Sequence, residues 1–145
     1  KGEVPEGEYL IPIGAADIKR SGTDVSILCY SKTVITSLAA AEQLAAIGIS
    51  AEVVDLRTIR PLDKAAVLNS VKKTNRALVV QEAWPQSSVG TWLAALIQEE
   101  AFDHLDAPVT VLSGRDCPYP YARSLEKMMA PTPEIIVEAV KKLTK

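Results

Sequence analysis

The sequence predicts an α/β fold in three layers: a five-stranded, mostly parallel sheet with one antiparallel edge strand, and helices on both faces. Short apolar runs rich in valine, isoleucine and leucine alternate with segments whose apolar residues recur at helical spacing. Parallel strands joined by helices form a sheet that is covered on both sides. A weakly alternating segment near the start, followed by turn residues, supplies the antiparallel edge.

The chain is predicted to form one domain preceded by a short arm. Its 145 residues suffice to bury about 70% of the unfolded surface, and 48% of them are hydrophobic and 23% charged. Residues 1–9 are polar and contain glycine and proline, so we expect a linker or entering arm before a single domain over residues 10–145. The apolar segment 10–13 is interrupted by Pro12, which favours an edge or docking strand.

The first regular elements are predicted to be a β-hairpin and a helix. Residues 16–20 alternate weakly, residues 21–24 carry turn chemistry, and residues 25–30 form an apolar strand. This pattern predicts a hairpin in which 16–20 is the antiparallel edge. A helix over 31–47 follows, because apolar residues recur there at helical spacing, and Gly48 suits the position after its end.

The next segment combines a buried strand with a sharp exit. Residues 51–57 contain a β-branched apolar run, and Pro61 keeps the residue before it extended. Asp63 is a suitable N-cap, because its carboxylate can accept hydrogen bonds from the first helical turn. We therefore expect a strand that ends before Pro61 and a helix over 63–73.

The second half of the chain supplies two more strands and three helices. Strands are predicted at 77–81 and 108–112, and the helix between them, at about 89–102, has one apolar and one charged side. A short helix over 123–129 precedes the closing helix over 132–143. The closing helix begins with an N-cap threonine, an N1 proline and a first-turn acid.

The residue types that are missing exclude several functions. A net charge of −2 gives no reason to expect nucleic-acid binding. The sequence has no dinucleotide motif, phosphate-binding loop or nucleophile elbow. His104 is the only histidine, which excludes a histidine metal cluster and leaves a capping or surface role. Cys29 and Cys117 have no metal or redox spacing and are predicted to be reduced, buried thiols.

Two groups of loop residues are candidates for binding. Arg57 and Arg60 lie at the carboxyl end of a central strand, where open α/β sheets usually bind ligands. They are predicted either to bind an anion or to form salt bridges. The second group shares a position on loops and is predicted to form an interface, the alternative being a lid over the core. It consists of Glu82, Trp84, Tyr119 and Tyr121. For Glu82 the alternative is a hydrogen bond to loop amides or to an arginine.

Six segments, in order along the chain, resemble one protein family. They are Leu10 to Gly14, Asp55 to Asp63, Lys73 to Arg76, Glu82 to Gln86, Leu105 to Pro108, and Pro118 to Ala122. Together they resemble the C-terminal domain of the beta subunit of the pyruvate dehydrogenase first component, the thiamine-diphosphate-dependent decarboxylase of 2-oxo acid dehydrogenase complexes. The resemblance runs from about residue 8 to the end and implies a fold like that of the transketolase C-terminal domain.

The resemblance also implies where the chemistry of the full enzyme lies. That enzyme decarboxylates pyruvate oxidatively and transfers an acetyl group to a lipoyl group, using thiamine diphosphate and magnesium. Both are held by the alpha subunit and the N-terminal domain of the beta subunit, so no cofactor, metal or catalytic residue is assigned to this chain. The chain alone is expected to be inactive. It would act in a heterotetramer of alpha and beta subunits, in the mitochondrial matrix or the bacterial cytoplasm.

In this family the domain assembles the heterotetramer and docks the subunit-binding domain of the acyltransferase component. The resemblance places Asp106 at the docking site, together with the C-terminus at Lys145. The ending departs from the family, because relatives often end in a hydrophobic residue, and Ala83 stands where glycine is usual. Two alternatives stay open: the equivalent domain of a branched-chain 2-oxo acid dehydrogenase, and an autonomous domain that binds a small anion through Arg57, Arg60 and the loop after strand 77–81.

Overall fold

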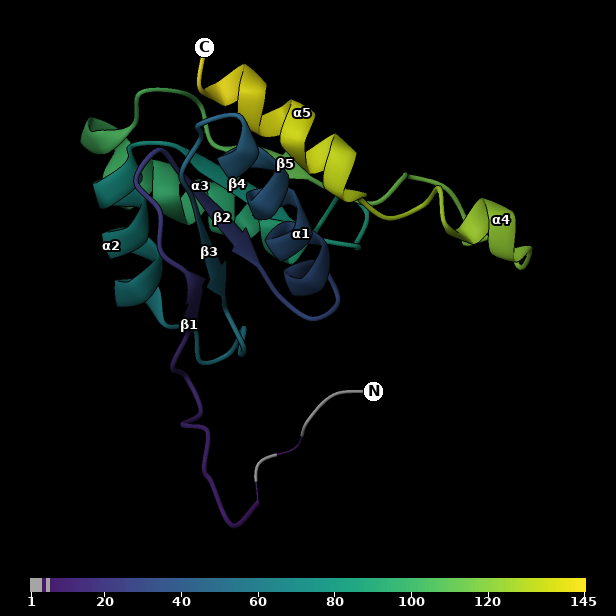
Figure 1. Cartoon of the computed structure of the whole chain (residues 1–145), viewed down its shortest axis with the longest axis horizontal. Helices are drawn as coiled ribbons and strands as arrows, with labels where there is room; N and C mark the ends of the chain where they lie inside the picture. Colours follow the sequence, from purple (N-terminus) through teal and green to yellow (C-terminus); the bar gives the residue numbers. More distant parts are fainter. Residues whose placement is uncertain (1–3, 5) are drawn as a thin grey trace.

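Five strands and five α-helices occupy the part of the chain that the computed structural model describes, residue 4 and residues 6–145 (Figure 1). In order they are β1 (Asp17–Arg20), β2 (Val25–Cys29), α1 (Thr33–Ala46), β3 (Ala51–Asp55), α2 (Lys64–Thr74), β4 (Ala77–Val80), α3 (Val89–Ala101), the 3-10 turn η1 (Phe102–His104), β5 (Thr110–Leu112), α4 (Arg123–Glu126) and α5 (Pro133–Leu143). None of the helices described is long and apolar enough to cross a membrane.

The strands form one sheet in the order β1-β3-β2-β4-β5. The pairs β2–β3, β2–β4 and β4–β5 are parallel, and β1 pairs with β3 antiparallel at one edge. Helices α1 and α5 cover one face of the sheet, and α2 and α3 cover the other (Figure 1). The predicted fold class is therefore confirmed.

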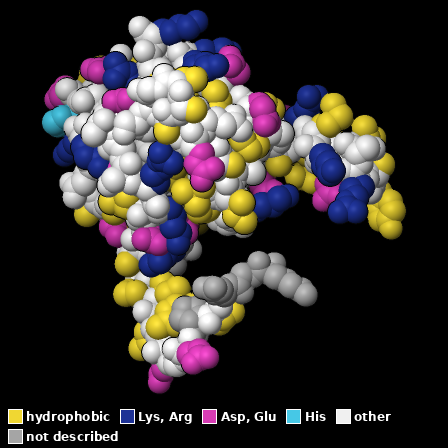
Figure 2. All heavy atoms as spheres, viewed as in Figure 1, with side chains coloured by type: hydrophobic (Ala, Val, Ile, Leu, Met, Phe, Trp, Pro, Cys, Tyr) yellow, Lys and Arg dark blue, Asp and Glu magenta, His cyan; other side chains and the backbone are white. Residues whose placement is uncertain are grey.

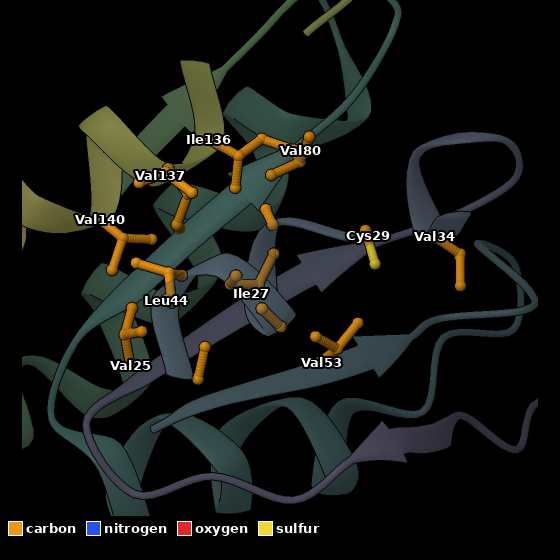
Figure 3. Close-up of a cluster of buried hydrophobic side chains, with 14 residues drawn as sticks. Val25, Ile27, Cys29, Val34, Leu44, Val53, Val80, Ile136, Val137 and Val140 are labelled. Atoms are coloured by element: carbon orange, nitrogen blue, oxygen red, sulfur yellow. The ribbon is translucent and has the colours of Figure 1, made fainter. Parts of the chain in front are cut away.

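The sheet divides the core into two halves, and successive side chains of the central strands point into opposite halves. Ile27 points into the half under α1 and α5, where it packs with Leu44 and Ile136 (Figure 3). Leu28 belongs to the opposite half, with residues of α2 and α3 such as Val67. This alternation follows from the two-residue period of a strand, and it explains why the central strands read as continuous apolar runs.

The predicted hairpin is wrong, because β1 pairs with β3 and not with β2. Both sides of β2 are already occupied by parallel neighbours, so the chain after β1 crosses over β3 to reach the centre. Gly22 makes this crossing possible, since a Cβ atom there would lie 2.2 Å from the carbonyl carbon of Ala51. The β1–β3 ladder also contains an irregularity between Ile18 and Arg20.

The segment before β1 also differs from its prediction. Residues 10–13 form no strand, and Leu10, Ile11 and Ile13 expose 84%, 53% and 81% of their surfaces. The predicted arm over 1–9 lies partly outside the described residues, which exclude 1–3 and 5, and it stays a prediction. Residues 10–13 have no ladder partner in the described part of the chain, so their large apolar side chains remain in solvent.

Local capping chemistry accounts for the helix starts that the sequence predicts. Asp63 accepts a hydrogen bond from the backbone N–H of Ala66 at 3.0 Å, and its second oxygen accepts from Ala16 at 3.0 Å. It thus fixes both the start of α2 and the entry to β1. Helix α1 ends at Ala46, and Gly48 follows the C-cap residue with φ +83°, a conformation that glycine adopts without strain.

Two predictions about single side chains have different outcomes. Cys29 is buried in the core, and burial raises the pKa of its thiol to about 12. Cys117 is exposed, so the prediction that both thiols are buried is wrong for this residue. It lies in the segment after β5 that projects from the body of the domain and is not covered by the sheet layers (Figure 1).

Candidate functional site

A buried glutamine positions the loop after β4. Gln81 is completely buried, and its side-chain oxygen accepts hydrogen bonds from the N–H of Gly90 at 2.8 Å and the hydroxyl of Tyr30 at 3.3 Å. Its amide nitrogen donates to the hydroxyls of Ser88 at 2.7 Å and Ser113 at 2.8 Å. The side chain therefore links the end of β4, the start of α3 and the end of β5. Sequence reasoning missed this residue.

Glu82 and Trp84 sit on the loop that Gln81 holds. Glu82 forms an ion pair with Lys32 at 3.5 Å, and within the described part of the chain its carboxylate pairs with no loop amide or arginine. Its negative charge adds to burial in raising the pKa of the Tyr30 hydroxyl. Trp84 exposes 50% of its surface, and its role at an interface stays a prediction. Ala83 has no positive φ; in this loop Ser87 has it, at +49°.

Tyr119 and Tyr121 lie on a segment that extends away from the body of the domain and carries α4 (Figure 1). Tyr119 is half exposed, and Tyr121 is fully exposed. Leu125 and Met128, on the same segment, each expose about half of their surface. Figure 2 shows hydrophobic side chains gathered on this segment and on the N-terminal arm. Aromatic and aliphatic side chains in such numbers on a projecting segment are typical of a surface that a partner covers.

The two arginines of the candidate anion site have different surroundings. The Arg57 guanidinium lies 2.7 Å from a carboxylate oxygen of Asp17, which Lys19 also approaches at 2.7 Å. These contacts, with the Lys19 hydrogen bond foremost, lower the pKa of Asp17. Arg57 is thus engaged in a salt bridge. Arg60 is exposed and has no acidic partner among the residues described.

A hydrogen bond and an ion pair connect Asp106 to the residues just before β4. Its backbone N–H donates to the carbonyl of Asn75 at 2.8 Å, and its carboxylate lies 3.1 Å from the guanidinium of Arg76. Arg76 in turn donates to the carbonyl of Leu143 at 3.0 Å, two residues before Lys145. The structure therefore brings Asp106 close to the C-terminal end of α5 through Arg76. The side chain of Asp106 remains 55% exposed.

Asp106 lines one apolar hollow, and a second hollow adjoins the residues that follow it. A cavity of about 290 Å³ is lined by Phe102, Leu105 and Asp106 itself, and shares Ala107 and Pro108 with its neighbour. That neighbour, about 620 Å³, lies between β5 and the outer side of α5. An exposed carboxylate at the rim of an apolar hollow has the mixed charged and apolar character of many interface surfaces, and the docking role of Asp106 stays a prediction.

The candidate residues do not converge on one centre. Arg57, Arg60 and Glu82 line three different cavities, so the anion site that would combine them is not formed. Among the residues described, no group of three or more histidine, cysteine, aspartate or glutamate side chains could hold a metal ion. His104 is exposed, and its backbone carbonyl accepts a hydrogen bond from Asn75 at 2.7 Å, as suits a helix exit.

These features define a three-layer α/β domain whose exposed polar and aromatic candidate residues lie in several separate places. The family model described as "Transketolase, C-terminal domain" matches residues 14–136. The chain belongs to this family. A solved structure titled "Split gene transketolase, inactive beta4 tetramer" has the same fold, with a TM-score of 0.81 and 25% identity, covering 99% of this chain and 47% of that one.

The curated relatives agree with the resemblance seen in the sequence. The mitochondrial pyruvate dehydrogenase E1 component subunit beta of Dictyostelium discoideum is 49% identical over 137 residues, which are 94% of this chain and 38% of that protein. The Rhizobium meliloti subunit of the same name is 46% identical over 140 residues, covering 96% and 30%. The beta subunit of the Bacillus subtilis acetoin:2,6-dichlorophenolindophenol oxidoreductase is 46% identical over 143 residues, covering 99% and 42%. The chain thus spans less than half the length of each of these relatives.

Proposed function

We propose that this chain is the C-terminal domain of the beta subunit of a pyruvate dehydrogenase E1 component, and that it serves assembly and docking. The observation that carries the proposal is the 46–49% identity to such subunits over nearly the whole chain. The full enzyme would be a heterotetramer of alpha and beta subunits that decarboxylates pyruvate and passes the acetyl group to the lipoyl group of the acyltransferase. It would work in the mitochondrial matrix or the bacterial cytoplasm.

Thiamine diphosphate and magnesium would be held elsewhere in that heterotetramer. This placement follows from the resemblance to the family, and the residues of this chain are assigned no part in binding the cofactor. Their contribution is to hold subunits together through the loop aromatics Trp84, Tyr119 and Tyr121.

The docking site for the acyltransferase would be centred on Asp106. Its backbone is fixed by the hydrogen bond to Asn75, and Pro108 keeps the following residue extended. The carboxylate is half exposed and oriented by Arg76, which also binds the end of α5 near Lys145. A basic subunit-binding domain would therefore meet a carboxylate that Arg76 already holds in place. Binding would not have to immobilise a flexible aspartate side chain.

Replacing Asp106 with alanine in the assembled heterotetramer is expected to weaken binding of the acyltransferase subunit-binding domain about tenfold, equivalent to about 1.4 kcal/mol. The loss should shrink at high salt, because partly exposed charges act mainly on the association rate and are screened. Stability should change by no more than about 0.5 kcal/mol, since the Arg76 ion pair is half exposed. Calorimetric titration at two salt concentrations measures both the affinity and its salt dependence.

The matched control is Asp103→Ala. Asp103 is a nearby exposed acid on η1 and has no ion-pair partner in the described part of the chain. The control should bind like the wild type. Equal affinities for Asp106→Ala, Asp103→Ala and the wild type would remove Asp106 from the docking site.

The 145-residue chain alone is expected to release no carbon dioxide from pyruvate above the buffer blank, even with thiamine diphosphate and magnesium added. The reason is that the proposed enzyme keeps its cofactor in parts absent from this sequence. The assembled heterotetramer serves as the positive control in the same assay. Turnover by the isolated chain would contradict the assignment of catalysis to the other parts.

An oxidoreductase that acts on acetoin is the second candidate, because the Bacillus subtilis relative matches 99% of this chain at 46% identity. Both candidates give this domain the same role in a beta subunit. Activity of the assembled enzyme on pyruvate and on acetoin, measured side by side, decides between them.

A further inference from the structure

An open apolar groove lies between the start of α3 and the loop that leads from β3 into α2. Trp92 and Leu96, one helical turn apart on α3, form one side, and Ile59 and Leu62 form the other. The groove has a volume of about 610 Å³. Trp92 exposes 48% of its surface, whereas the other three side chains are partly buried against the core.

Two basic side chains, Arg60 and Lys64, complete the lining of this groove. Lys64 forms an ion pair with Glu100, with about half of the lysine and a third of the glutamate side chain exposed. Such exposed pairs contribute little and exchange readily. Arg60 has no acidic partner among the described residues, and the nearby carboxylate of Asp63 is occupied by the backbone N–H groups of Ala66 and Ala16. The groove therefore offers one free cation beside an apolar floor.

We propose that this groove docks an acidic amphipathic segment of a protein partner. A carboxylate of the segment pairs with Arg60, and an aromatic or aliphatic side chain next to it covers Trp92 and Leu96. Tryptophan and arginine are among the residues that most often dominate protein interfaces, and here both line the same groove. The free charge on Arg60 selects acidic segments over basic ones.

A protein segment fits the groove better than a small molecule does. Sites for small molecules usually enclose most of the ligand surface. This groove is lined on two sides only, and its largest side chain, Trp92, is half exposed. A segment that runs along α3 would bury the ring under several of its own residues, whereas a small ligand would stay largely in water.

The proposal is tested with the 145-residue chain and a fluorescein-labelled helical peptide of glutamate, leucine and phenylalanine, with apolar residues at i, i+3, i+4 and i+7. A peptide with lysine in place of glutamate is the charge control. We expect the acidic peptide to bind at least tenfold more tightly in fluorescence anisotropy. In the Trp84→Phe background, which leaves Trp92 as the one tryptophan, the emission should shift to shorter wavelength on binding.

Charge reversal separates docking in the groove from general attraction. Arg60→Glu should weaken binding at least tenfold, whereas Arg123→Glu, the same charge change on the projecting segment, should leave it within twofold. Trp92→Ala, in a half-exposed position, should keep the circular dichroism spectrum and lose binding. Absence of binding by the acidic peptide, or equal effects of the two reversals, would overturn the proposal. Equally tight binding of naphthalene-2-carboxylate would overturn it too, in favour of a small-molecule site.

Discussion

Replacing Lys73 with methionine is expected to lower the free energy of unfolding by about 2–4 kcal/mol, because it leaves a buried carboxylate without its cation. Glu52 is fully buried in β3, and one of its oxygens accepts hydrogen bonds from Lys73 and, at 3.4 Å, from the N–H of Gly22. The other oxygen has no hydrogen-bond partner among the described residues. Breaking a buried pair from one side costs about 3–5 kcal/mol, and the 44% exposure of Lys73 reduces this figure.

Lys72→Met is the matched control. Lys72 and Lys73 both lie in the last turn of α2, so each loses a similar interaction with the helix dipole. The control should cost no more than about 0.5 kcal/mol. In the double variant Glu52→Leu/Lys73→Met, most of the stability should return, because an apolar pair often replaces a buried ion pair at no cost. Urea unfolding of all four proteins checks this, and equal losses for Lys72→Met and Lys73→Met would refute the explanation.

Replacing Gln81 with leucine is expected to cost about 1–3 kcal/mol, because the buried N–H of Gly90 is left without a partner. Leucine removes the acceptor of the Gly90 N–H and the donor to Ser88 and Ser113. Only this amide orientation serves the network, since a backbone N–H must meet an oxygen. The start of α3 and the loop carrying Glu82 should therefore loosen together.

Hydrogen exchange distinguishes this local effect from general destabilisation. In Gln81→Leu, the amide of Gly90 should exchange faster than the amides of β2, which lies in the centre of the sheet. Gln86→Leu is the control, because Gln86 is exposed on the same loop and should be nearly neutral. Uniform loss of protection across the sheet would show that Gln81 acts on the whole core and not on the loop.

The helices and strands could be predicted well because their signals, helix caps and apolar runs, depend on residues that are adjacent in the sequence. Asp63 caps α2, and the apolar runs became the central strands, since capping and burial each depend on a few neighbours. Strand pairing was predicted wrongly at β1 for a physical reason. The same turn residues serve a hairpin or a crossing to another strand, and what decides between them is that β3 and β4 occupy both sides of β2.

The contact surfaces could be predicted only residue by residue. Exposure of Trp84, Tyr119 and Asp106 followed from their places on loops next to prolines or strand ends. The ion-pair partners of Glu82 and Asp106 could not be predicted, because Lys32 and Arg76 reach these carboxylates from other elements. The sequence carried no periodic signal for these long-range pairs. Likewise, Arg57 and Arg60 are three positions apart, yet they line different cavities.

The two edges of the sheet determine how this domain can meet its neighbours. At one edge, β1 is irregular between Ile18 and Arg20 and carries the charged side chain of Lys19. At the other, β5 has three residues and follows Pro108 closely. Neither edge presents a long, flat row of free backbone groups to which a foreign strand could add. Copies of the folded domain therefore resist growth into continuous intermolecular sheets, even when their exposed aromatic side chains bring them together.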